Sequence, residues 1–193
     1  MRHNKVRDLE AELMREVCND VRVEPELLPL DNDLAVINGN MAQKARLDVS
    51  GNGVWGPQER TFLDIRIMHP NSPSYLDKDI TQVYRQHERE KKRTYNERII
   101  QIEKGSFTPI VMSTFGGMGL EGERYHKRIA ELISIKRNEP YPSVIEYIRT
   151  RLRFCLLKSV LMSLRGVRGK VVKEKTSPMS SLSFNLINFN EQY

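Results

Sequence analysis

The sequence lacks the features of a disulfide-stabilised, secreted or membrane-spanning protein. Only two of its 193 residues are cysteines, Cys18 and Cys155, and they lie far apart in apolar, helix-like patterns. We therefore expect reduced core cysteines of an intracellular protein, with no zinc-binding partner nearby. The first ten residues, MRHNKVRDLE, contain no apolar stretch that resembles a signal peptide. The longest apolar run, residues 154–164, is interrupted by Lys158 and is shorter than the roughly 20 residues of a membrane span, so we expect a soluble chain without a membrane partner.

Acidic side chains are missing from one long stretch of an otherwise mixed sequence. The chain has 31 Lys and Arg against 25 Asp and Glu, and its net charge is +6. No acidic residue occurs from Tyr147 to Lys170, although this stretch contains seven basic ones. Such a surface indicates an anionic partner such as nucleic acid, although a net charge of this size also occurs on ordinary soluble surfaces. We select Arg149, Arg153 and Lys158 as candidate nucleic-acid-binding residues.

Length and composition predict one folded domain with a tail. An apolar content of 39% is enough for a hydrophobic core in a chain of 193 residues. Residues 170–193 are rich in serine and asparagine and show no sustained period. We therefore expect a domain over residues 1–169 and a poorly ordered tail over residues 170–193.

The order of predicted elements indicates an α/β fold. Helical periodicity occurs at residues 2–19, 77–103, 121–136 and 143–164, and strand-like runs occur at 21–24, 45–50, 62–67 and 107–113. Residues 31–42 combine strand-like and turn-like features, and their assignment stays ambiguous. Pro109 favours a position early in its strand or at a sheet edge, and the glycines of FGGMG (115–119) favour a turn. We expect a central mixed sheet of about four strands flanked by helices, with further helices at the C-terminal end.

Two of the strand-like segments each carry one aspartate. Asp48 lies in ARLDVS, and Asp64 lies in TFLDIRIM, where strand propensity disfavours aspartate. If the glycine-rich loop 51–57 joins the two strands as an antiparallel pair, Leu47 and Val49 face one core and the two carboxylates converge on the other face. Mg²⁺ or Mn²⁺ prefers oxygen ligands and keeps several waters, so two carboxylates and a substrate phosphate suffice to hold it. Taken singly, Asp48 is also compatible with a turn cap, and Asp64 with a polar interruption of an edge strand.

The helix predicted over residues 77–103 carries a polar face. His87, Glu88, Lys91 and Tyr95 share this face by their spacing of three and four residues. A solvated charged stripe has the same pattern. In a catalytic site, Lys91 would position the attacking water or stabilise the phosphate, and Glu88 would orient Lys91 or the water. Lys92 is the alternative to Lys91, because an error of one residue rotates the face by about 100°.

These motifs resemble the core of the PD-(D/E)XK, or restriction-endonuclease-like, nuclease superfamily. Asp48 takes the place of the first aspartate, and Asp64-Ile65-Arg66 takes the place of (D/E)XK. Arginine does not deprotonate in proteins, so Arg66 in place of the lysine would clamp phosphate but not act as a base. One lineage of the superfamily carries its lysine on the following helix, as Lys91 does here. The blocks RHNKVRD, LDIRIMHPNSPSY, HEREKKRTYNERI, GSFTPIVMSTFGGMG and LRFCLLKSVLMSLRG are similar, in this order, to the endonuclease-like region at the C-terminus of reverse-transcriptase proteins of non-LTR retrotransposons.

The resemblance implies a metal-dependent endonuclease that nicks DNA. The side chains of Asp48 and Asp64 and the carbonyl of Ile65 would bind the ion, while Arg66 and Tyr95 would contact phosphate. The implied partners are DNA and a reverse-transcriptase domain or its RNA, and the implied location is the nucleus. Two other classes stay open, namely a catalytically decayed nucleic-acid-binding module and a plain interaction domain.

Overall fold

A four-stranded mixed sheet forms the centre of the protein. The computed structural model describes residues 2–28 and 46–171, with side chains described as far as residue 162. The strands lie in the order β1 (Asn19–Val23), β2 (Val49–Asn52), β3 (Arg60–Met68) and β4 (Ser106–Ser113). Strand β2 pairs antiparallel with both β1 and β3, and β4 runs parallel to β3. The predicted α/β class with a four-stranded mixed sheet is confirmed, as are the antiparallel pairing of the two aspartate-bearing segments and the edge position of Pro109 in β4.

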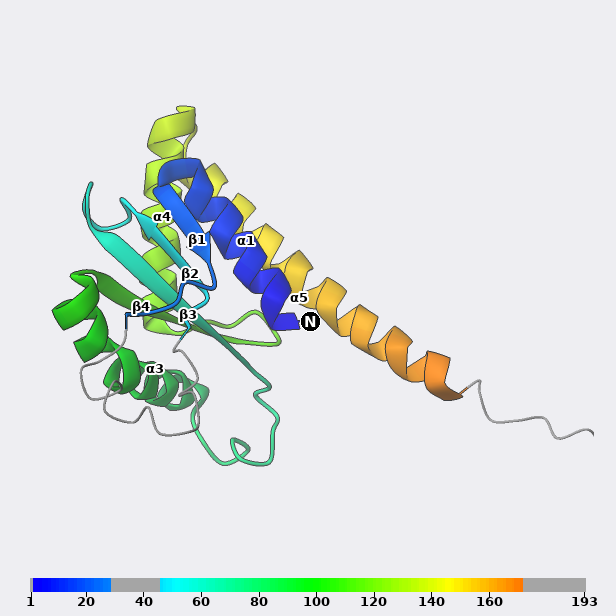
Figure 1. Ribbon diagram of the computed structural model, residues 1–193. Helices are drawn as coiled ribbons and strands as arrows, with labels where there is room; N and C mark the ends of the chain where they lie inside the picture. The colour runs from blue at the N-terminus through cyan, green and yellow to red at the C-terminus, as the bar shows by residue number, and fades with distance from the viewer. Residues whose placement is uncertain (1, 29–45, 172–193) are drawn as a thin grey trace, which may run out of the picture.

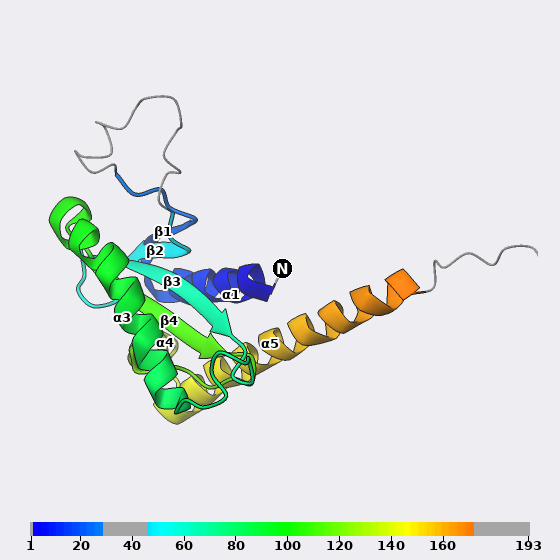
Figure 2. The ribbon, with the colours of Figure 1, turned by 90° about the horizontal axis from the view of Figure 1, so that it is seen from below.

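Helices cover both faces of the sheet. The elements are α1 (Arg2–Val17), α3 (Ile80–Arg98), the short π-helix η1 (Ile99–Glu103), α4 (Leu120–Arg137) and α5 (Tyr141–Val171). Helices α1, α4 and α5 lie on one side, and α3 lies on the other (Figures 1 and 2). Helix α5 runs beside α1 and then extends beyond the rest of the domain, well past the predicted end at residue 164.

The larger hydrophobic core lies between the sheet and α1, α4 and α5. Successive strand side chains point to opposite faces, so Leu63 and Ile65 of β3 both project toward these three helices. Leu13 of α1, Ile129 of α4 and Ile148 of α5 meet them there and are fully buried. This packing fixes α1, from Arg2 onward, against β3.

Two smaller hydrophobic clusters lie on the opposite face, beneath α3 and η1. The first consists of Leu27, Leu47, Phe62, Ile99 and Phe107. The second consists of Met68, Val83, Tyr84 and Val111. On β3, Asp64 and Arg66 lie between Phe62 of the first cluster and Met68 of the second. The α3 face of β3 therefore has a polar gap between two apolar patches.

The first aspartate-bearing strand is shorter than predicted. Strand β2 begins at Val49, and the chain bends at Asp48. The prediction that Leu47 and Val49 share one face is therefore wrong: Leu47 packs beneath α3 and η1, whereas Val49 packs in the larger core. The ambiguous residues 31–42 and most of the predicted tail (172–193) lie outside the described residues.

The glycines of FGGMG allow a close approach of the loop after β4 to α3. Gly116 has a φ of 91°, a conformation that favours glycine. A Cβ atom on Gly117 would collide with the Tyr84 hydroxyl, and one on Gly119 would collide with the Glu88 carboxylate. The predicted turn is confirmed, and its glycines also permit the contact between α3 and the start of α4.

Both cysteines are free, as predicted. Cys18 is buried and Cys155 is half-buried, and burial raises the pKa of the Cys18 thiol to about 11. Within residues 2–28 and 46–171, no helix is both long enough and apolar enough to cross a membrane.

Candidate active site

Asp64 forms a buried ion pair with Lys91 in the polar gap beneath α3. The aspartate is 8% exposed, and the Lys91 ammonium approaches its Oδ2 atom to 2.5 Å. Burial raises the pKa of the Asp64 carboxyl above its ordinary value, and the lysine offsets only part of this rise. Apart from this ion pair, no hydrogen bond from the described residues reaches Oδ2. The carboxylate is desolvated, and one of its oxygens has unused capacity to accept.

Asp48 reaches the same region from the open edge of β3. Because β2 begins opposite Leu63, the peptide groups of β3 beyond that residue have no strand partner on this side. The Ile65 amide donates instead to Asp48 Oδ2 at 2.5 Å. The negative charge of Asp48 also contributes to the raised pKa of Asp64. The structure thus brings together the two aspartates and the Ile65 peptide group, which the sequence had singled out.

His3, which the sequence analysis did not select, lies between two of these groups. Its Nε2 atom is 3.0 Å from the Ile65 carbonyl oxygen and 3.2 Å from Asp48 Oδ2. The hydrogen bond with Asp48 raises the pKa of His3, partly opposed by burial. The contact with Ile65 spans 62 residues of sequence, so no local spacing marks it. The imidazole contacts the same two oxygens that the resemblance assigns to a metal ion.

Lys92 and Glu88 are directed to α4 instead of the aspartates. Lys92 Nζ lies 2.9 Å from a Glu121 carboxylate oxygen, and Glu88 accepts a 2.9 Å hydrogen bond from the Glu121 amide. The residue before α4, Gly119, has no side chain to cap the helix, so Glu88 supplies an acceptor from α3. Burial raises the pKa of the Glu88 carboxyl. Of the two adjacent lysines, the structure brings only Lys91 to Asp64, and it gives Glu88 a helix-capping position.

Arg66 and Tyr95 flank the ion pair of Asp64 and Lys91. Arg66 leaves the same face of β3 as Asp64 and pairs with Glu90 at 2.9 Å. Tyr95 packs on Phe107, with its ring centroid 5.6 Å away, and the Lys91 ammonium lies 5.8 Å from the tyrosine ring. Arg66 is therefore at the partly exposed rim of the site. Tyr95 is held mainly by ring contacts.

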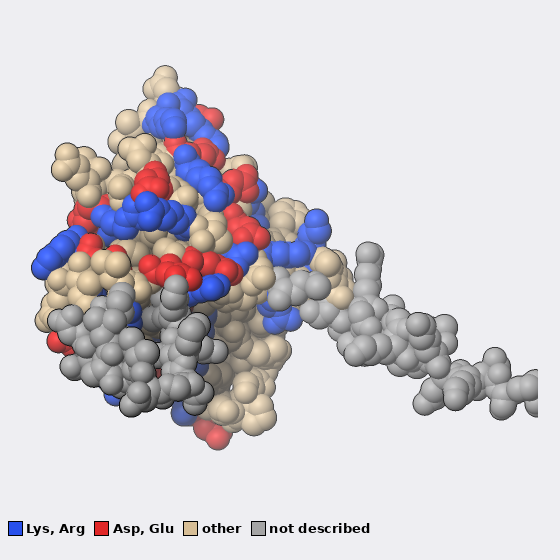
Figure 3. Space-filling model, in the orientation of Figure 1, with Lys and Arg blue, Asp and Glu red and all other residues tan. Residues whose placement is uncertain are grey.

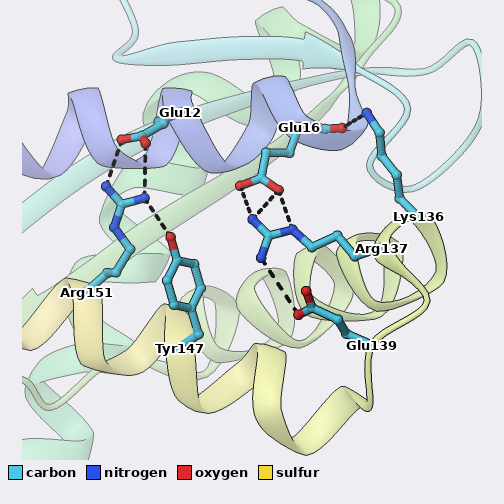
Figure 4. Close-up of polar contacts among 7 residues, drawn as sticks. All are labelled: Glu12, Glu16, Lys136, Arg137, Glu139, Tyr147 and Arg151. Atoms are coloured by element: carbon cyan, nitrogen blue, oxygen red, sulfur yellow. Dashed lines mark hydrogen bonds and ion pairs between the residues drawn. The ribbon is translucent and has the colours of Figure 1, made fainter.

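The basic residues selected on α5 belong to a different part of the surface. Arg149, Arg153 and Lys158 are exposed, and only Arg153 has an ion pair among the described residues, with Glu146 at 3.3 Å. Arg151, by contrast, binds Glu12 of α1 and is not available to a ligand (Figure 4). Lysines, arginines and carboxylates are interspersed over the face shown in Figure 3. The sequence of α5 therefore suggests more unpaired basic side chains than the surface of this helix presents.

The oxygen atoms at this site suit a hard divalent cation that keeps most of its waters. The donor set comprises two carboxylates and one carbonyl, and Mg²⁺ needs few protein ligands when a substrate phosphate supplies others. Within the described part of the chain, no group of three or more His, Cys, Asp or Glu side chains is placed to hold an ion. The arrangement therefore fits an open site completed by water and substrate, and does not fit a closed structural metal site.

No protein-family model matches the chain, and no curated protein matches it. The resemblance to nucleases rests on the sequence motifs alone.

Proposed function

We propose that the protein is a metal-dependent endonuclease that nicks DNA. The observation that carries the proposal is the buried contact of Asp64 with Lys91, beside Asp48 and the Ile65 peptide. These groups come from β3, from α3 and from the residue before β2, so distant parts of the sequence converge on one polar gap. A desolvated carboxylate with a raised pKa and a lysine partner is a typical feature of catalytic sites.

Each group has a distinct role in the proposed reaction. Asp48, Asp64 and the Ile65 carbonyl would hold Mg²⁺ or Mn²⁺, which supplies a water of lowered pKa and screens phosphate charge. Lys91 would remain beside Asp64 and donate to a phosphate oxygen as negative charge develops there. Arg66 would leave Glu90 and clamp a neighbouring phosphate, because arginine stays protonated and binds phosphate in a bidentate manner. His3 would yield the Asp48 and Ile65 oxygens when the ion binds.

Nicking of supercoiled plasmid in the presence of Mg²⁺ or Mn²⁺ tests the proposal. The Asp64→Asn variant should lose nicking by roughly 100-fold or more, because it removes a metal ligand. DNA binding should persist or tighten, since a negative charge near the phosphate disappears. Asp20→Asn is the matched control, because Asp20 is an exposed carboxylate that binds Arg22 and Arg60 on β1 and β3. Metal-dependent nicking that survives in Asp64→Asn would overturn the proposal.

A catalytically decayed nucleic-acid-binding module is the second candidate. It is favoured by the side-chain partners of the two aspartates: Asp48 contacts His3, and Asp64 contacts Lys91. It is also favoured by Arg66, which stands where the nuclease motif has a lysine. This candidate predicts DNA binding that falls steeply with salt and no nicking with either metal.

A further inference from the structure

A second candidate surface lies where the end of β4 meets α5. A groove of about 520 Å³ is lined by Arg2, His69, Phe115, Arg153, Leu157 and Val160, among others. An adjoining cavity of about 190 Å³ shares Gly116, Arg153 and Leu156 with it and reaches toward Lys127 and Arg149. Arg2, which lines the groove, directly precedes His3, whose imidazole contacts the Asp48 carboxylate.

An exposed aromatic ring stands at this groove. Phe115 is 68% exposed, although most large apolar side chains of the described residues are buried. Its only ring contact among the described residues is an edge contact with His69, with centroids 5.5 Å apart and planes at 68°. An edge-to-face contact with one ring covers at most one face of Phe115, so at least one face is available for stacking.

The groove and the cavity are cationic at the rim and apolar at the floor. Arg2, Lys127, Arg149 and Arg153 line them, against a single carboxylate, Glu123. The Arg2 Nε atom is buried and has no hydrogen-bond partner within the described residues. Met112, Leu152 and Leu156 form part of the apolar floor. The surface therefore combines positive charges for phosphate with a flat ring and an apolar cleft.

We propose that this groove binds a single strand of nucleic acid next to the scissile position. A base would stack on Phe115 and occupy the apolar cleft, while Arg2, Arg149 and Arg153 would contact the flanking phosphates. Aromatic stacking combined with backbone cations is how proteins bind single strands without reading their sequence. The inference rests on the proposed function, because the groove serves the strand that passes the Asp48 and Asp64 site.

The test is equilibrium binding of fluorescein-labelled oligodeoxythymidylate and oligouridylate to the full chain, followed by fluorescence anisotropy in EDTA. Phe115→Ala should weaken binding of the better ligand roughly tenfold, as expected for the loss of one stacked base. Phe154→Ala is the matched control, because Phe154 is 67% exposed on α5 and lines neither the groove nor the cavity. Its affinity should equal that of the unmodified protein. Whichever oligonucleotide binds more tightly identifies DNA or RNA as the strand.

Three further variants separate aromatic stacking from nonspecific apolar contact and from charge. Phe115→Leu keeps apolar bulk without an aromatic face, so it should lose affinity as Phe115→Ala does. Arg153→Ala should weaken binding and flatten its salt dependence. Arg124→Ala should change neither, because Arg124 is equally exposed and weakly paired but lines neither the groove nor the cavity.

The outcomes of this binding experiment can be distinguished from those of the plasmid-nicking experiment. Equal affinities of Phe115→Ala and Phe154→Ala, full binding by Phe115→Leu, or no binding of either oligonucleotide would each overturn the groove proposal. Because the experiment contains EDTA, it reports binding without cleavage. Strand binding that depends on Phe115 in a protein that fails to nick plasmid would sink the nuclease proposal and leave the groove as a binding site.

Discussion

The ion pairs on the two sides of the sheet differ in burial and in what they join. Between α1 and the helices α4 and α5, Arg151 makes two contacts with Glu12, at 3.0 and 2.9 Å, and Arg137 makes similar contacts with Glu16 (Figure 4). These side chains are partly exposed, and both carboxylate oxygens are engaged. Beneath α3, Asp64 is buried, and its Oδ2 has only the Lys91 ammonium.

This difference indicates that the two groups of ion pairs have different roles in the domain. Partly exposed bidentate pairs lose little hydration and orient helices, each for a modest gain in stability. Burying a carboxylate loses more hydration free energy than its contact with one lysine regains. A buried ion pair is therefore weak evidence that its residues stabilise the fold. The α1 side is therefore explained by packing alone. The Asp64 pair is better explained by a ligand that uses the unused accepting capacity of Oδ2.

The largest difference in stability is expected between variants of the two adjacent lysines of α3. Lys91→Ala leaves Asp64 buried without its partner, and we expect a loss of about 2 kcal/mol at neutral pH. Lys92→Ala breaks a more exposed pair with Glu121 and should cost less than about 1 kcal/mol. Urea denaturation of both variants provides the measurement. Equal losses would show that the Asp64 pair is no different from a surface pair.

The pH dependence of Lys91→Ala has a definite sign. Burial already raises the pKa of Asp64, and loss of the lysine raises this pKa further. The native state then binds the proton more tightly than the unfolded state does. The deficit of the variant should therefore grow as pH rises above the ordinary aspartate range and shrink as pH falls toward it. A deficit that grows toward acid pH would contradict the assignment.

A smaller effect is expected where two arginines of α5 are compared. Arg151→Ala removes the contacts with Glu12 and with the Tyr147 hydroxyl, and it should cost about 1 kcal/mol at low ionic strength. Arg149→Ala removes an exposed cation with no ion pair among the described residues, and its stability should be unchanged. Thermal unfolding at low and high salt measures both, and the Arg151 effect should decrease with salt. A large loss of stability in Arg149→Ala would show that Arg149 also holds α5 in place.

The smallest effect concerns His3. The hydrogen bond with Asp48 raises the pKa of His3, so the protonated ring stabilises the folded state. This contribution is complete below the unfolded pKa of about 6.5 and is lost as pH rises through the higher folded value. The ring is partly exposed, so we expect His3→Gln to cost only about 0.5 kcal/mol at pH 6 and nothing at alkaline pH. Denaturation in EDTA across this range measures it, and a constant difference would exclude His3 titration as the cause.

Hydrophobic periodicity predicted the helices and strands, whereas the arrangement of the candidate site depends on long-range contacts. Alternation in LDIRIM correctly placed Leu63 and Ile65 in one core and Asp64 on the opposite face. It could not show where β2 begins, because the bend at Asp48 follows from the capture of the Ile65 amide by its carboxylate. Helical spacing placed Glu88 and Lys91 on one face of α3. It could not show that the start of α4 takes the Glu88 carboxylate.

The parallel pairing of β3 with β4 has a consequence for how the chain folds. The 37 residues between these strands include α3 and must be arranged before the two strands can pair along their length. Closing such a long segment lowers the conformational entropy of the chain before the contacts between β3 and β4 can form. By contrast, β2 and β3 are joined by a short loop. We therefore expect β2 and β3 to pair early, and Lys91 to meet Asp64 only in the late stages of folding. Amide protons of β4 should accordingly gain protection from hydrogen exchange after those shared by β2 and β3.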